Sequence, residues 1–93
     1  MISRLANTLE AMYEAREQGD VEQETRLQAR MIPLLVQALT SKDDDLLELS
    51  VYCVSLLEEE AYVRVQKEAQ SKAADDPQII ESLRKVAELS RGV

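Results

Sequence analysis

The segment DDDLLELSVYCVSLLEEE, from Asp43 to Glu60, decides the fold of this chain. A mostly apolar stretch lies between two acidic triplets. When residues 46–57 are placed on a helix, at about 100° per residue, their apolar side chains cover about 260° of its circumference. Glu48 and Ser55 mark the narrow polar strip, and Ser50 falls within the apolar arc. A helix of this kind packs against neighbours on two sides, or on one side and against a second subunit. We therefore expect it to be the central helix.

Two questions about the local structure of this segment stay open. The run SVYCVSLL could form a strand, because Val and Tyr favour sheets, but the chain offers no second strand to pair with it. Acidic residues at Glu58–Glu60 would be repelled by the dipole at a helix C-terminus. This predicts that the helix continues and spans residues 44–73, with a break near Glu59 as the alternative.

Three further helices are predicted from apolar residues at helical spacing, over residues 2–18, 21–39 and 77–91. Gly19 can adopt a left-handed C-cap conformation and Asp20 can cap the next helix, which predicts a tight turn. Asp76 before Pro77 is a start signal, because proline is well suited to the first helical position. One of the Asp43–Asp45 carboxylates can cap the third helix, and Gly92 can end the last one.

Pro33 lies inside the second predicted helix. Its ring removes one N–H group and crowds the carbonyl of Ala29. The helix is therefore expected either to kink near Arg30 or to restart at Pro33.

The composition predicts a small all-α protein. The chain has 93 residues, with two Gly and two Pro, and its apolar fraction of 45% is sufficient for one thin core. We expect a single domain over residues 1–93, built as an up-down bundle of three to four helices with the third one central. The buried side of that helix predicts that Leu56→Glu or Val54→Asp would collapse the fold.

The charge and cysteine content limit the compartment and the partners. A net charge of −7 opposes binding to nucleic acid or to an anionic membrane. A single cysteine excludes an intrachain disulfide framework, and the N-terminal stretch lacks the apolar run of a signal peptide. The longest apolar run is too short to span a bilayer. The expected location is the cytoplasm.

The inventory of reactive groups does not favour catalysis. The chain has no histidine, so neither a Cys-His nor a Ser-His pair can form. Cys53 lies on the apolar arc and is expected in the core. The carboxylates are consecutive along the chain, diverge around a helix and match no metal motif. We expect no enzyme activity, no cofactor and no metal.

Two stretches resemble known helical families. LEAMYEAREQGDVEQETRLQARMIPLL (Leu9–Leu35) resembles the first helical hairpin of small flagellar and type III export chaperones, with an acidic GD turn followed by Arg and Leu-Leu. MIPLLVQALTSKDDDLLELSVYCVSLL (Met31–Leu57) is similar to one helix pair of an armadillo or HEAT repeat. Each resemblance implies a fold-level analogy and points toward binding rather than catalysis.

The function expected from the sequence is an acidic protein-interaction module, an adaptor or export-type chaperone that buries an amphipathic helix of a partner. The alternative is an acidic inhibitor or immunity-type protein that blocks a basic site. The helix over 44–73 is apolar on more sides than the small chain can cover, which also predicts a homodimer. The candidate contacts for a partner or a second subunit are Met31, Leu34, Leu46, Leu49, Val54, Leu57 and Tyr62.

Overall fold

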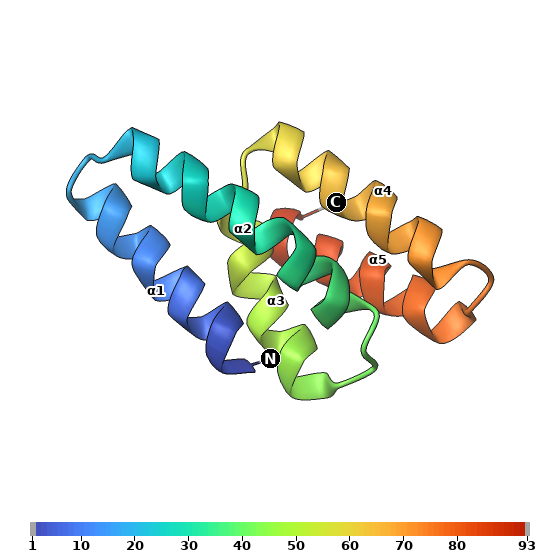
Figure 1. Ribbon diagram of the computed structural model, residues 1–93. Coiled ribbons are helices and arrows are strands. Elements are labelled where there is room, and N and C mark those ends of the chain that lie inside the picture. The colour runs from blue at the N-terminus through green and yellow to red at the C-terminus, as the bar shows by residue number, and fades with distance from the viewer. Residues whose placement is uncertain (1, 93) are drawn as a thin grey trace.

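The computed structural model describes residues 2–92, and over this range it contains five α-helices and no strand (Figure 1). The helices are α1 (Ile2–Glu17), α2 (Val21–Leu39), α3 (Asp44–Leu56), α4 (Glu59–Ala73) and α5 (Pro77–Arg91). The prediction of an all-α protein is confirmed. The predicted number of three to four helices is wrong, because the third predicted helix is divided into α3 and α4.

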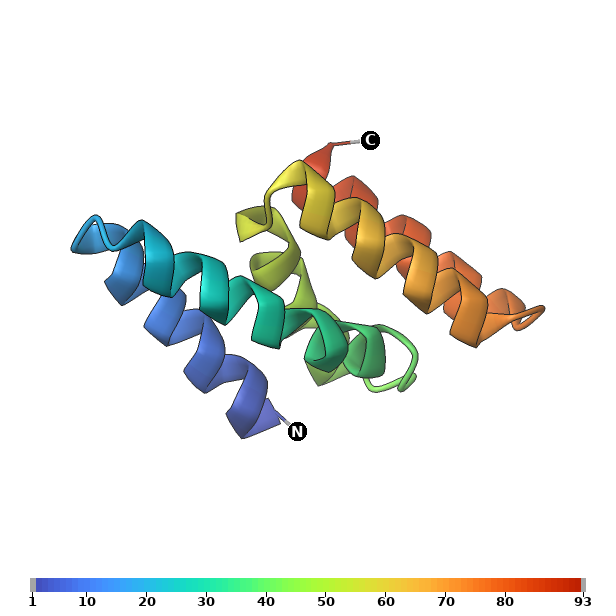
Figure 2. The same cartoon turned by 45° about the horizontal axis from the view of Figure 1, so that its top comes forward.

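Two helical hairpins, α1–α2 and α4–α5, form the two sides of the molecule, and α3 lies between them (Figures 1 and 2). The helix α2 packs against α1, α3, α4 and α5, whereas α3 packs against α1, α2 and α5. The prediction of a central third helix is met in part, because α3 lies between the two hairpins, but α2 is the helix that packs against all the others. It does so through a broad buried face, formed by Leu27, Gln28, Met31, Ile32, Leu35, Ala38 and Leu39.

The helix ends predicted from local signals are confirmed. Gly19 has a φ of 69°, and the Gln23 N–H donates to the Asp20 side chain at 3.1 Å. Asp43 caps α3 and Asp76 caps α5 through side-chain oxygens that accept backbone N–H groups. Gly92 ends α5 in the left-handed conformation.

Pro33 does not break α2, which runs without interruption from Val21 to Leu39. The predicted restart at Pro33 is therefore wrong. Pro33 and Ala29 both lie on the exposed face of the helix. Water can satisfy the Ala29 carbonyl there.

The break between α3 and α4 lies at Leu57 and Glu58, both in extended conformation. The prediction of one helix over residues 44–73 is wrong, and the alternative of a break near Glu59 is confirmed. The break places Glu59 and Glu60 in the first turn of α4, where the helix dipole favours acidic residues.

The core draws on all five helices. Its fully enclosed side chains include Leu5, Met12, Met31, Leu35, Leu39, Cys53, Val54 and Val65. Ser50 is also buried and donates to the carbonyl of Leu46 at 2.7 Å, as its place in the apolar arc predicts. Between residues 2 and 92, no helix is long and apolar enough to cross a membrane.

Candidate functional site: the groove between α3 and α5

A surface groove of about 760 Å³ lies between α3 and α5. It is formed by one stripe of side chains on each helix, at the three- and four-residue spacing that places residues on a common face. The stripe on α3 consists of Asp44, Leu47, Glu48, Val51 and Tyr52. The stripe on α5 consists of Gln78, Glu81, Ser82, Lys85, Val86 and Leu89.

The groove has an apolar lining that is only partly covered. Val86 is buried, and Leu47 and Val51 are half-buried against the core. Tyr52 is 56% exposed and Leu89 is 65% exposed, although both are large and border the same groove. Exposed apolar residues that gather at one place on a soluble protein commonly mark an interaction surface.

The charges around the groove are distributed unevenly. Asp44 and Glu48 stand on the α3 side, and within residues 2–92 neither forms an ion pair. On the α5 side, Glu81 accepts hydrogen bonds from Arg84 at 2.5 and 3.1 Å, which lowers the pKa of the Glu81 carboxyl. Lys85 also lines this side. The α3 wall therefore offers to a ligand in the groove two carboxylates that have no ion-pair partner within residues 2–92.

The two helices that form the groove run in the same direction and are tied at both ends. At their N-terminal ends, Lys42 Nζ lies 2.8 Å from an oxygen of Asp76, the N-cap of α5. At their C-terminal ends, Arg91 of α5 donates to the carbonyl oxygens of Val54 at 3.1 Å and Leu57 at 2.8 Å. These contacts fix the spacing of the two walls.

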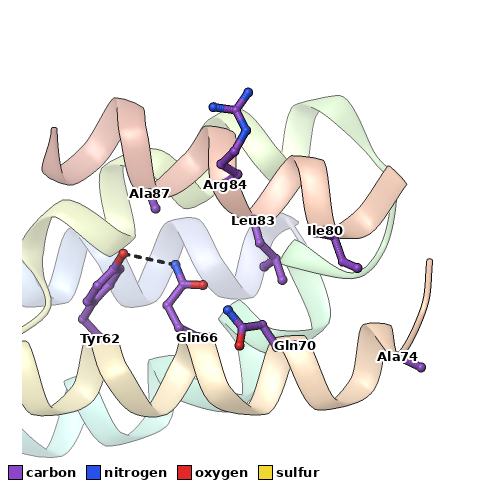
Figure 3. Close-up of a pocket in the computed structure, with 8 residues that line it drawn as sticks. All are labelled: Tyr62, Gln66, Gln70, Ala74, Ile80, Leu83, Arg84 and Ala87. Carbon is purple, nitrogen blue, oxygen red and sulfur yellow. Dashed lines mark hydrogen bonds between the residues drawn. The ribbon is translucent and has the colours of Figure 1, made fainter. Parts of the chain in front are cut away.

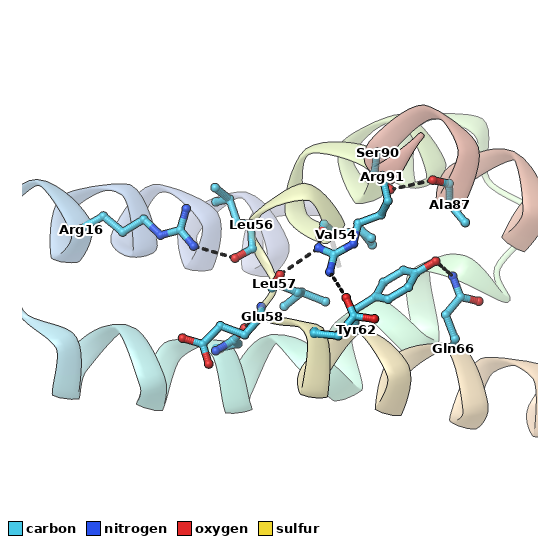
Figure 4. Close-up of polar contacts among 12 residues, drawn as sticks. Arg16, Val54, Leu56, Leu57, Glu58, Tyr62, Gln66, Ala87, Ser90 and Arg91 are labelled. Carbon is cyan, nitrogen blue, oxygen red and sulfur yellow. Dashed lines mark hydrogen bonds and ion pairs between the residues drawn. The ribbon is translucent and has the colours of Figure 1, made fainter. Parts of the chain in front are cut away.

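Arg91 is the centre of a wider set of contacts at the α3–α4 junction (Figure 4). Its side chain is 18% exposed, pairs with Glu59 at 3.0 Å and lies 4.3 Å over the centre of the Tyr62 ring. Arg16 donates to the carbonyl of Leu56 at 2.7 Å and also pairs with Glu24. Arginine at a helix C-terminus satisfies carbonyls that the helix leaves unpaired and complements its dipole.

A second groove, of about 650 Å³, lies between α4 and α5 (Figure 3). Gln66 and Gln70 line it from α4, and Ile80 and Leu83 line it from α5. The Gln66 amide donates to the Tyr62 hydroxyl at 3.3 Å. This groove is smaller, and its polar lining includes two neutral amides and Arg84, whose guanidinium is already paired with Glu81 and Glu88.

The structure places the seven residues predicted as contacts in or against the core of the single chain, not together on one exposed surface. Four of them are buried in the core of the single chain: Met31, Leu46, Val54 and Leu57. The other three are half-buried and pack against that core: Leu34, Leu49 and Tyr62. Tyr62 borders the α4–α5 groove, and none of the seven lines the α3–α5 groove.

The sequence contained part of the signal that identifies the groove. Leu47, Val51 and Tyr52 belong to the apolar arc of the opening segment. They are the part of that arc that the other helices do not fully cover. Leu89 was missed because it lies outside the stripe of α5 that faces the core. Which part of the arc stays exposed depends on the packing of α5, which the local sequence does not determine.

The one thiol of the chain is enclosed in the core. Cys53 is fully buried, and desolvation raises the pKa of its thiol to about 12, so it stays protonated and unreactive at neutral pH. In the described part of the chain, no cluster of three or more acidic or sulfur ligands could hold a metal ion.

Comparison of the chain with protein-family models, with curated proteins and with solved structures finds no match. The α3–α5 groove and its charges are therefore the basis on which a function is proposed.

Proposed function

We propose that the protein is a helix-binding interaction module whose α3–α5 groove receives an amphipathic helix of a partner protein. The observation that carries the proposal is the coincidence of Tyr52 and Leu89, both mostly exposed, on the walls of one apolar groove. Two helices with a groove between them can accept the apolar face of a third, whose residues fill it at positions three and four apart. An adaptor or an export-type chaperone would use such a groove.

The charge of the groove defines the partner helix. Asp44 and Glu48 would face one flank of the bound helix, so that flank carries Lys or Arg. The net charge of −7 acts in the same direction and increases the rate of encounter with a basic partner. Apolar burial provides most of the affinity, because exposed ion pairs contribute little.

A designed peptide pair tests this proposal. One labelled amphipathic helix has leucines on one face and lysines on its flanks, and the other has glutamates in place of the lysines. The basic peptide is expected to bind by fluorescence anisotropy, and the acidic peptide is expected to bind at least about tenfold more weakly.

Matched substitutions locate the binding. Leu89→Glu is expected to weaken binding of the basic peptide by more than about tenfold, a loss of about 1.4 kcal/mol. Val63→Glu makes the same change on α4, at a residue that is 40% exposed and lines neither groove. This variant should bind the basic peptide with the affinity of the native chain. Equal effects from both variants would contradict binding in the α3–α5 groove.

Salt separates this proposal from its alternative, an acidic module that blocks a basic site. Groove burial persists in high salt, whereas binding through surface charge is screened. If Leu89→Glu left the binding affinity unchanged and high salt abolished binding, the alternative would be favoured.

A further inference from the structure

The break between α3 and α4 occurs without a helix-breaking residue. Residues 44–73 contain neither Gly nor Pro, and sequence patterning allows either one continuous helix or a break near Glu59. Three side chains from distant parts of the chain contact the junction instead: Gln28, Arg16 and Arg91. The bend is therefore imposed by tertiary contacts.

Each contact occupies a backbone group that a continuous helix would pair internally. The Glu58 N–H donates to Gln28 Oε1 at 2.6 Å, whereas in one helix it would donate to the carbonyl of Val54. Arg91 binds that Val54 carbonyl and also the carbonyl of Leu57. Arg16 binds the carbonyl of Leu56. The bent and continuous forms therefore both satisfy these groups, with different partners.

Straightening the junction would move the α4–α5 hairpin away from the rest of its own chain. A helix over residues 44–73 would be about 45 Å long. In the bent form, α4 packs on α2 and α5 packs on α3. The same surfaces of a second copy can receive the displaced hairpin without any new contact. A linker as short as Leu57–Glu58 favours such an exchange, because it can be absorbed into the helix.

We propose that the α3–α4 junction is a hinge, and that two copies of this chain exchange their α4–α5 hairpins to form a dimer. Each α3–α5 groove in this dimer is built from α3 of one copy and α5 of the other. The exchange does not depend on whether the groove binds a partner helix. Exchange requires the α2–α4 and α3–α5 contacts to open, so monomer and dimer interconvert slowly.

A proline at position 59 locks the bent form. Position 59 is the first residue of α4, where proline is well tolerated, and Glu58 already has the extended conformation that precedes proline. In a continuous helix the same proline would remove a hydrogen bond and clash with the carbonyl of Ser55. Glu59→Ala is the matched control, because it also removes the ion pair with Arg91 but permits either form.

Gln28→Leu is expected to favour the continuous helix over the bent form. Leucine leaves the Glu58 N–H without its acceptor in the bent form, whereas the continuous helix provides one. Each variant is unfolded in urea, refolded at high micromolar concentration, diluted, and measured by size exclusion with light scattering. We expect a species of twice the 10.5 kDa chain mass that persists after dilution, several-fold more abundant in Gln28→Leu than in the native chain.

Adding Glu59→Pro to Gln28→Leu is expected to abolish this dimer, and adding Glu59→Ala is expected to leave it. If Gln28→Leu does not fold by circular dichroism, Arg91→Ala releases the Val54 and Leu57 carbonyls and serves in its place. A folded release variant that stays monomeric overturns the proposal. So does a dimer that survives Glu59→Pro, or one that dissociates at once on dilution, as side-by-side association would.

Discussion

At the scale of single residues, the apolar side chains of α3 are not equivalent. Val54 is completely buried, whereas Leu56 is only partly buried and its carbonyl faces Arg16. Position on the apolar arc alone predicts that an acidic residue at either place would collapse the fold. The structure corrects this for Leu56, because a glutamate there can reach water.

Val54→Asp is expected to destabilise the protein by more than about 3 kcal/mol, because it buries an unpaired charge. Leu56→Glu is expected to cost about 1 kcal/mol, close to the average for a point substitution. Urea unfolding followed by circular dichroism measures both. If Leu56→Glu proved as damaging as Val54→Asp, burial at this position would be greater than the structure indicates.

At the scale of elements, the sequence predicts the helix ends well where the signal is local. Asp20, Asp43 and Asp76 cap the helices that follow them, and each acts through groups two or three residues away. The α3–α4 break could be predicted only as an alternative, because the side chains that hold it are distant in the sequence. Gln28 lies 30 residues from the N–H group that it binds, and Arg16 lies 40 residues from its carbonyl.

The α1–α2 turn depends on Gly19, whose φ of 69° is unfavourable for most side chains. A Cβ atom there would meet no other atom within 4 Å, so strain of the backbone is the main cost of substitution. Gly19→Val is expected to destabilise the protein by about 1 kcal/mol or more. Gly19→Asn should cost less, because asparagine tolerates this conformation. Equal shifts of the thermal midpoint would contradict a purely conformational cost.

At the scale of the whole molecule, polar side chains join α3 and α5 at both ends of the groove between them. The Lys42–Asp76 pair joins the loop before α3 to the loop before α5. The candidate site was only partly predictable, because its shape depends on how two helices distant in the sequence pack together. The sequence indicates an excess of apolar surface on α3, but the position of α5 determines that Leu47, Val51 and Tyr52 form a groove wall.

The pH dependence of stability tests the Lys42–Asp76 tie. The hydrogen bond from Lys42 lowers the pKa of the Asp76 carboxyl, with help from the N–H groups that it caps. A carboxyl whose pKa is lower in the folded state stabilises the fold above its unfolded pKa, and this contribution is lost as the pH falls through the folded value. Asp76→Asn keeps a capping side chain but not the charge.

We therefore expect Asp76→Asn to be less stable than the native chain at pH 6 and to lose less of its stability between pH 5 and about pH 3. Asp75→Asn, one residue earlier and outside the cap, should follow the native curve more closely. Urea midpoints across this pH range provide the measurement. If the urea midpoints of Asp76→Asn and the native chain changed in parallel with pH, the Lys42–Asp76 pair would make no contribution to stability.

Labelling of the enclosed Cys53 thiol can measure how the core opens, because a reagent reaches the thiol only in an opened molecule. It is the only cysteine, and a maleimide can reach it to form a stable thioether only while the inner face of α3 is uncovered. Once the fold opens, the thiol regains ordinary acidity and reacts, and each reaction permanently marks one molecule that has opened. At reagent concentrations where the reaction outpaces reclosing, the rate at which the marked mass accumulates is the rate at which this helix loosens, obtained without a tag or a mutation.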